Sequence, residues 1–379
     1  MTEAFYIITR TMIMVEVAHP QHSSQKLTER GSKKRRRCSA SLPVMGPEIS
    51  GDENLKIAND ALREYDCNAD WTFVTSDDYS FEGKATATFS VHTKPELNTV
   101  SGGFSIKGRK QGKQHWINQD CFKISETFDE NEEFLDVYNV CDGHGKNGHV
   151  VATCVSGMLP DILRRTGYDQ KKSLQRIHSE LSTSAVDAET SGCTCLTTII
   201  NKKTRSIEVG NVGDSRCLLI RRSSSGDLEP LPLSTDQKPS DLHEKRRIIE
   251  AGGIVHGVNG GAERVWFTCN QMSIGLAMSR SVGDLRAHEH GVSHEPQIHC
   301  HSICNNDVCL ILASDGLWDI FQNEQVRDFV NSYIHVYGKE LWNPADLARY
   351  LAESARLSWE KFSPYNIDDI TVVVVRLDT

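Results

Sequence analysis

Apolar, β-rich segments that end or begin at an aspartate recur along this chain of 379 residues. Four segments show the pattern, "NVCDGHG", "EVGNVGDSR", "LILASDGLWD" and "NIDDITVVVV", and their aspartates are Asp142, Asp214, Asp315, Asp368 and Asp369. Asp120 in "INQDCF" and Asp284 in "SRSVGD" stand in similar settings. A single aspartate at a strand end is usually a turn former. Its repetition predicts instead that several strands share one core and that their ends meet, which brings carboxylates together.

Carboxylates that are brought together repel one another and need cations. Hard divalent ions such as Mg²⁺ or Mn²⁺ match a ligand set of carboxylates, a backbone carbonyl and water. Two such ions a few Å apart would share a water, lower its pKa and direct it at an electrophile such as phosphorus. The aspartates therefore predict a two-metal hydrolytic site.

Composition narrows the class of protein. Hydrophobic residues make up 38% and charged residues 25% of the chain, as in ordinary globular proteins. The formal net charge of −9 argues against general binding to nucleic acid or to anionic membranes. Apolar runs stay shorter than the roughly 18 residues that a spanning helix needs, and the first residues lack the basic start of a secretory signal. We expect an intracellular protein without a membrane span.

The 12 cysteines show no regular disulfide spacing, which favours reduced cysteines. The segment "HCHSIC", His299 to Cys304, suggests zinc, but it has no partner CxxC or HxxxH motif, so zinc is the weaker interpretation there.

Three regions are predicted along the chain. Residues 1–50 read as a disordered basic extension, with five consecutive basic residues from Lys33 to Arg37. The alternatives for this extension are a nuclear-import run or a phosphorylation segment at Ser39 or Ser41. Residues 51–84 form a lead-in of uncertain character, and residues 85–379 form the catalytic domain.

Hydrophobic periodicity predicts a mixed α+β fold. Strands are expected at "ATATFSVHT", "FLDVYNVCD", "TCLTTII", "RSIEVGNVGD", "SRCLLIRR", "VCLILASD" and "DDITVVVVRL". Helices are expected at "HVVATCVSGMLPDILRRTG", "SLQRIHSELSTSAVDAE", "SDLHEKRRIIEAGG" and "NEQVRDFVNSYI". A last helix should follow Asn343 as N-cap and Pro344 as its first residue. Strands in hairpin-like succession, with helices inserted in blocks, favour a strand core covered by helices over a parallel βαβ sheet.

Eight stretches occur in a characteristic order between about residues 100 and 377: "NQDCF", "VCDGHG", "SGCTCLTTII", "GNVGDSRCLLI", "LSTDQKPSDLHEKRRIIEAGGIV", "GLAMSRSVGD", "LASDGLWDIFQNEQV" and "DDITVVVV". With these motifs the chain resembles the type 2C metal-dependent serine/threonine protein phosphatases. The resemblance implies a four-layer α-β-β-α sandwich with a two-metal site in the cleft between the sheets. It also implies that a metal-activated water hydrolyses phosphoserine and phosphothreonine in phosphoprotein substrates, and that the protein is a monomer.

The resemblance assigns roles by position. Asp142 would bridge both Mg²⁺ or Mn²⁺ ions and the Gly143 carbonyl would bind one of them. Asp315 and Asp368 would complete the other ion's ligands, with Asp120 close by through water. Asp214 and Asp284 match positions linked to a weaker third metal. His144 matches the proposed general acid, and an imidazole with a pKa near 6.5 suits that role around neutral pH.

The chain also departs from the family pattern. Gln119 stands where many members have glutamate, which removes a negative charge from the metal shell and should soften metal affinity. Asp369 stands where asparagine is usual and partly restores that charge. The phosphate-binding residue is left open among Arg109, Lys110 and Lys113 in the long segment "GRKQGKQHWINQD". Lys113 is favoured for its proximity to Asp120, and Arg109 is retained because its planar fork holds phosphate in two places.

The alternative from another class is a pseudophosphatase that binds a partner without catalysis. Its sequence mark would be the loss of a core aspartate, but Asp142, Asp315 and Asp368 are all present. A different metal-dependent phosphohydrolase on the same fold is a further alternative.

Overall fold

Strand β17 (Ile370–Asp378), predicted from the valine run, is buried on both faces. Val372 and Val374 belong to a cluster with two C-terminal helices, whereas Val373 and Val375 belong to a cluster between two sheets. Successive side chains of a strand point to opposite faces. An unbroken run of β-branched residues is therefore what a strand covered on both sides requires.

The computed structural model describes residues 86–91, 97–113, 115–128, 134–258, 261–269, 271–338 and 341–378. The predicted extension 1–50 and lead-in 51–84 lie outside these residues. Two main sheets organise the described part of the chain, and neighbouring strands in both are antiparallel. The six-stranded sheet has the order β1 (Thr86–Val91), β2 (Asn98–Ile106), β17, β16 (Asp307–Ala313), β9 (Arg216–Arg222), β10 (Leu228–Pro232). The five-stranded sheet has the order β15 (Gln297–Ser302), β8 (Ser206–Val212), β7 (Cys195–Asn201), β4 (Phe134–Cys141), β3 (Cys121–Phe128).

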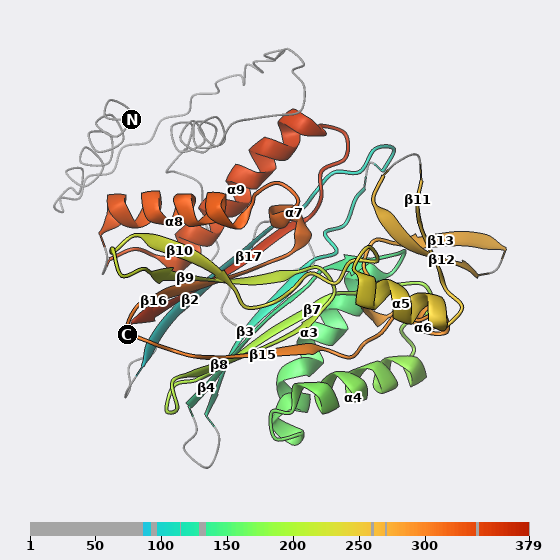
Figure 1. Ribbon diagram of the computed structural model, residues 1–379, viewed down its shortest axis with the longest axis horizontal. Coiled ribbons are helices and arrows are strands. Elements are labelled where there is room, and N and C mark those ends of the chain that lie inside the picture. The colour runs from blue at the N-terminus through green and yellow to red at the C-terminus, as the bar shows by residue number, and fades with distance from the viewer. Residues whose placement is uncertain are drawn as a thin grey trace, which may run out of the picture. The chain divides into compact units, whose positions relative to one another are not determined.

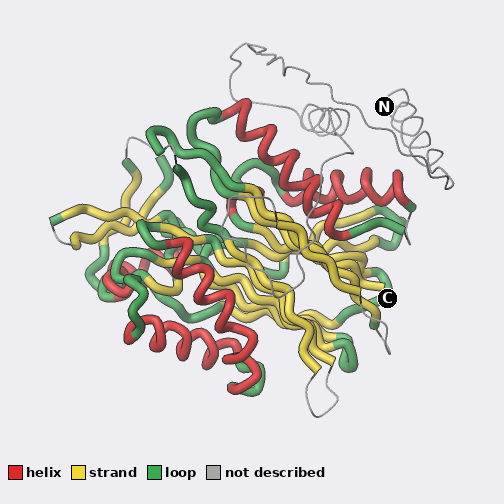
Figure 2. The backbone as a smooth tube through the Cα atoms, turned by 180° about the vertical axis from the view of Figure 1, so that it is seen from behind, coloured by secondary structure: helices red, strands yellow, loops and turns green. Residues whose placement is uncertain are grey.

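Helices cover the outer faces of both sheets (Figure 1). α8 (Asn323–Tyr337) and α9 (Pro344–Phe362) share an apolar cluster with the six-stranded sheet. α3 (Gly148–Arg165) and α4 (Gln170–Thr183) share one with the five-stranded sheet. A third cluster joins the two sheets, and Figure 2 shows the strands stacked between the helices. The mixed α+β prediction is confirmed, with two main antiparallel sheets.

Two smaller sheets complete the fold. The first has the order β14 (Val282–Gly283), β6 (Gly192–Cys193), β5 (Gly143–His144), and it joins segments that lie far apart in the sequence. The second contains β11 (Ile254–Gly257), β12 (Glu263–Cys269) and β13 (Met272–Leu276), next to α5 (Leu242–Glu250). Two short helices begin at aspartates of the repeated pattern: α6 (Leu285–His288) follows Asp284, and Asp315 is the first residue of α7 (Asp315–Trp318).

The observed ends of two helices can be compared with those predicted from the sequence. α9 begins as expected, because the Asn343 side chain accepts a hydrogen bond from the Ala345 N–H at 2.8 Å and Pro344 opens the helix. α4 was predicted to run through residues 173–189, but it ends at Thr183. The Ser184 hydroxyl accepts a hydrogen bond from the Val186 N–H at 3.1 Å, which replaces a helical partner.

Other sequence predictions concern cysteines and membranes. The ten cysteines of the described ranges are free thiols. Within those ranges, none of the helices combines the length and the apolar character needed to cross a bilayer. In the segment from His299 to Cys304, the His301 ring is paired with Asp307, with Nε2 2.8 Å from Oδ2.

Candidate metal centre

Strand register explains why the aspartates meet. In the five-stranded sheet Cys121 at the start of β3 pairs with Cys141 at the end of β4, so Asp120 and Asp142 leave the sheet side by side. In the six-stranded sheet the end of β16 pairs with the start of β17, which places Asp315 and Asp368 at one edge. The Ser314 hydroxyl connects the two sheets by donating to Asp120 Oδ2 at 2.7 Å.

Burial and neighbouring charge raise the pKa of three of these carboxylates, Asp120, Asp142 and Asp315. Burial raises the pKa of Asp142 well above its usual value, and the charges of Asp120, Asp315, Asp368 and Asp214 add to the effect. Burial likewise raises the pKa of Asp315, with contributions from Asp214 and Asp368. These interactions place the five carboxylates in one electrostatic neighbourhood, where negative charge is disfavoured unless a cation balances it.

Asp120 shows the effect most clearly. Burial raises its pKa to about 7, the nearby Asp369 adds to the shift, and the Ser314 hydroxyl opposes it. An aspartic acid that keeps its proton until neutral pH lies where negative charge is disfavoured, and a nearby cation would stabilise its charged form.

Several carboxylate oxygens of the centre lack a donor. Asp120 Oδ1, Asp214 Oδ1 and Asp284 Oδ1 are buried and accept no hydrogen bond from the described residues. A buried anionic oxygen without a partner is costly. Hard divalent cations bind such oxygens directly, so the donor set fits Mg²⁺ or Mn²⁺.

Gly143 is held in a space that only glycine fits. Its N–H donates to the Gln119 carbonyl at 3.1 Å. A Cβ at this position would lie 2.5 Å from the carbonyl oxygens of Gln119 and Gly148. The Gln119 side chain donates to the Gly145 carbonyl at 2.9 Å. Gln119 therefore supports the loop after Asp142 through a neutral hydrogen bond.

His144 is positioned by the small sheet. β5 and β14 both pair with β6, which brings His144 next to Asp284, with Nε2 2.5 Å from Oδ2. The Ser281 hydroxyl donates to the same carboxylate oxygen at 2.7 Å. Burial lowers the pKa of His144, but the charge of Asp284 and its hydrogen bond outweigh burial, so the pKa is raised. The ring therefore favours its protonated form more than a free histidine does.

Lys238 was not predicted from the sequence. Its ammonium lies 2.5 Å from Asp214 Oδ2. Burial lowers the pKa of Lys238, but the charge of Asp214 reverses the effect and the pKa is raised. The two residues are 24 positions apart on loops, so no local spacing in the sequence signals the pair. Lys238 partly neutralises the acidic centre.

The three candidate phosphate-binding residues have different neighbours. Lys110 Nζ lies 2.8 Å from Asp368 Oδ1, at the edge of the acidic centre. Arg109 donates to the Pro364 carbonyl at 2.9 Å and lies 3.5 Å from the Glu360 carboxylate. Lys113 is exposed, with Nζ 4.7 Å from the centre of the Trp116 ring.

Asp369 anchors the loop that carries these basic residues. Its carboxylate accepts hydrogen bonds from the Gly108 N–H at 2.6 Å, the Trp116 indole at 2.9 Å and the Gln119 N–H at 2.8 Å. Burial raises the pKa of Asp369, and these donors oppose the shift. Its carboxylate thus holds Gly108, Trp116 and Gln119 in place.

Comparisons with known proteins identify the family. The family model described as Protein phosphatase 2C matches residues 117–358. Probable protein phosphatase 2C 72 of Arabidopsis thaliana is 31% identical over 294 residues, covering 72% of this chain and 84% of that protein. Probable protein phosphatase 2C 61 of the same plant is 33% identical over 305 residues, covering 76% and 86%.

A solved structure shares the fold. The serine-threonine phosphatase 2C from Toxoplasma gondii superimposes with a TM-score of 0.62 at 18% identity, covering 77% of this chain and 99% of that one. The chain belongs to the protein phosphatase 2C family, the Mg²⁺- or Mn²⁺-dependent serine/threonine protein phosphatases.

Proposed function

We propose that this phosphatase hydrolyses phosphoserine and phosphothreonine in proteins at a centre of two divalent cations, in the cleft between its two main sheets. The ligands would be the carboxylates of Asp142, Asp315 and Asp368 and the Gly143 carbonyl, with Asp120 acting through water. One observation carries the proposal: burial and the charges of neighbouring carboxylates from both sheets raise the pKa of Asp142 and of Asp315, and a buried oxygen of Asp120 accepts no hydrogen bond from the described residues.

When bound, the cations would lower the pKa of a shared water and offset the charge of the phosphate. The protein's own part is to fix the carboxylates. The Asp142 N–H donates to the Thr194 hydroxyl at 2.9 Å, and Ser314 holds Asp120. Both partners lie directly beside strand ends, Thr194 between β6 and β7 and Ser314 after β16, so the ligands would need little reorganisation to bind metal.

His144 would supply the proton for the departing serine or threonine oxygen. Its pairing with Asp284 supports this role, because the carboxylate favours the protonated ring. Asp284 and Asp214 would also offer their unpartnered oxygens to a weaker third cation. Those oxygens are distinct from the ones that contact His144 and Lys238.

Lys110 is the basic residue that the geometry favours for contact with phosphate. Its ammonium already lies at the edge of the acidic centre, where it contacts Asp368. Arg109 is engaged by Pro364 and Glu360, and Lys113 by Trp116. A phosphate-binding role for Arg109 or Lys113 remains a prediction from the sequence.

We further propose that residues 85–379 suffice for turnover by a monomer, and that the basic extension 1–50 acts only on location, in the cytoplasm or through Lys33–Arg37 in the nucleus. Deleting the extension should then leave peptide turnover within about threefold, or ~0.7 kcal/mol in barrier.

The decisive experiment is dephosphorylation of phosphothreonine peptides by the purified full chain, with Mn²⁺, with Mg²⁺ and with EDTA. Turnover should be absent in EDTA and return with millimolar Mn²⁺ or Mg²⁺. Undiminished turnover in EDTA would overturn the metal centre. Metal binding by calorimetry without any turnover would identify a pseudophosphatase.

A further inference from the structure

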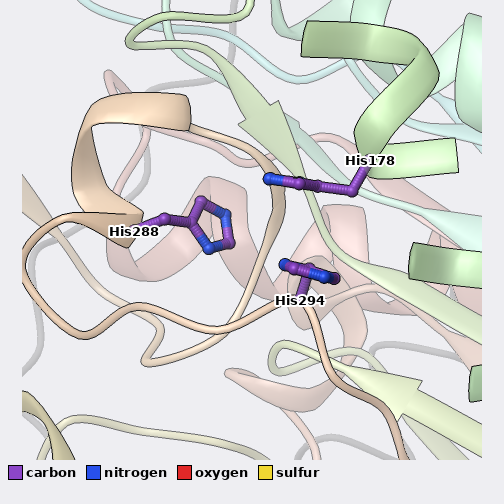
Figure 3. A group of neighbouring side chains, drawn as sticks. All are labelled: His178, His288 and His294. Carbon is purple, nitrogen blue, oxygen red and sulfur yellow. The ribbon is translucent and has the colours of Figure 1, made fainter. Parts of the chain in front are cut away.

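Three histidines from separate segments meet beside α4, outside the acidic centre (Figure 3). His178 lies in α4, His288 ends α6, and His294 lies in the loop between α6 and β15. Each offers a ring nitrogen, and these atoms all lie within 4.8 Å of one another. In the described part of the chain, this is the one group of three or more His, Cys, Asp or Glu residues with that property.

The rings are packed closely. His178 and His294 stack nearly parallel, with ring centres 4.1 Å apart and 7° between the ring planes. His288 approaches His178 edge-on, with ring centres 4.3 Å apart and 61° between the planes. Protonated rings at these distances would repel strongly. Burial lowers the pKa of His178 to about 3 and that of His288 to about 4, and the neighbouring histidines add to both shifts.

Neutral imidazoles need partners for their nitrogens. Nδ1 of His178 and Nδ1 of His294 are buried and make no hydrogen bond to the described residues. His288 Nε2 lies 2.9 Å from the Gly283 carbonyl oxygen. That carbonyl is an acceptor, so Nε2 donates to it, and in the neutral ring the lone pair that a metal would use lies on Nδ1. A backbone carbonyl on the far nitrogen is the usual support of a metal-binding histidine.

We propose that His178, His288 and His294 bind a borderline transition-metal ion, Zn²⁺ in the first place, at a site separate from the acidic centre. Three neutral imidazoles are a ligand set for zinc, copper or nickel and not for Mg²⁺. A fourth position would remain for water. The ion would tie α4 to the segment that follows Asp284.

The distances allow the site after a small adjustment. Tetrahedral Zn²⁺ with Zn–N of about 2.0–2.1 Å holds its nitrogens about 3.3 Å apart. The present limit of 4.8 Å is therefore closed by movements of about 1 Å, which side-chain rotations supply. Two of the three ligands, His288 and His294, lie within seven residues of each other. The third, His178, is held by α4.

The test uses the full chain, stripped of metal and then kept in millimolar Mg²⁺ so that the oxygen ligands are occupied. Calorimetric titration with Zn²⁺ should show one tight equivalent. Replacing His178 by Ala or His294 by Gln should weaken that equivalent at least about tenfold, since even a supporting residue is worth that much. Co²⁺ should give the intense visible bands of a tetrahedral site in the parent and not in either variant.

Matched controls separate this site from the acidic centre. His243→Ala removes an exposed histidine of α5 and should leave Zn²⁺ binding unchanged. Asp142→Asn should retain the zinc equivalent. Circular dichroism of the His178→Ala and His294→Gln variants checks that they fold. The proposal is overturned if the parent binds no zinc equivalent in Mg²⁺, if folded His178 and His294 variants bind it as the parent does, or if Asp142→Asn abolishes it.

Discussion

His144 Nε2 lies 2.5 Å from Oδ2 of Asp284, a residue 140 positions further along the chain. The carboxylate that the family resemblance links to a weaker third metal is thus also the direct partner of the proposed general acid. One oxygen of Asp284 contacts the ring, while the other is buried without a donor. The proposed third-metal site and the proposed general acid therefore share the side chain of Asp284.

The first prediction concerns the pH profile. Asp284→Asn removes the charge that raises the pKa of His144 and leaves burial, which lowers it. The acid would then lose its proton at lower pH, so the basic limb of kcat should move to lower pH. Ser281→Ala keeps the charge of Asp284 and should not move the limb downward. The measurement is the pH dependence of kcat at saturating Mn²⁺. An unshifted basic limb in Asp284→Asn would show that His144 is not the general acid.

The second prediction concerns leaving groups. His144→Ala should slow hydrolysis of phosphates with poor leaving groups far more than of phosphates with good ones, because only the former need a proton. The comparison is phosphothreonine peptide against p-nitrophenyl phosphate. An equal loss on both substrates would assign His144 to structure.

The third prediction concerns the metal-free protein. Asp120 has a pKa raised from 3.8 to about 7, so between these pH values the folded state holds more protons than the unfolded state. The contribution of Asp120 to stability in EDTA should therefore fall as the pH rises from about 4 to 7, by the order of a few kcal/mol, whereas the lowered pKa values of His178 and His288 contribute in the opposite direction. Urea unfolding at several pH values measures this. Asp120→Asn lacks this contribution, so the stability of the parent minus that of the variant in EDTA should fall as the pH rises, and saturating Mn²⁺ should remove that trend. A difference that rises with pH would contradict the prediction.

Much of this centre follows from sequence because its ligands sit at strand ends. An apolar run specifies a strand, and an aspartate at its boundary specifies where a carboxylate leaves the sheet. The strands β4, β16 and β17 were predicted with nearly the observed limits. Antiparallel pairing then brings the ends of β16 and β17 together, and the stacking of the two sheets brings the end of β4 to the same place.

Contacts between loops could not be predicted in that way. Lys238 reaches Asp214 from another loop, and Lys110 rather than the sequence-nearer Lys113 reaches Asp368. Proximity in sequence says little about which side of a loop faces the site. The end of α4 was missed for a related reason, since Ser184 competes for a backbone partner within a pattern that otherwise continues as a helix.

The fourth prediction separates the basic residues. Lys110→Met should reduce kcat/KM about 10- to 100-fold, as expected for a lost charged hydrogen bond of about 1.5–3 kcal/mol. Lys113→Met, with its exposed side chain over Trp116, should stay within about threefold. Saturating Mn²⁺ is used for both, because Lys110 also contacts Asp368. A larger loss for Lys113→Met would restore the choice made from the sequence.

The last prediction compares two acids of the centre. Asp142 would bridge both cations, so Asp142→Asn removes charge from two coordination spheres at once. Turnover should fall by more than the roughly 10²- to 10³-fold typical of a single lost contributor. The metal-free variant should be at least as stable as the parent, since burial and neighbouring carboxylates disfavour the charge of Asp142.

Asp214→Asn is the matched comparison for Asp142. It leaves Lys238 without its partner and affects only the weaker third cation, so the tight cations should remain and turnover should fall only in part. Calorimetric titration with Mn²⁺ and peptide kinetics on both variants measure the difference. Near-normal turnover by Asp142→Asn would make "DGHG" a turn, and equal loss in the two variants would place Asp214 among the ligands of the tight cations.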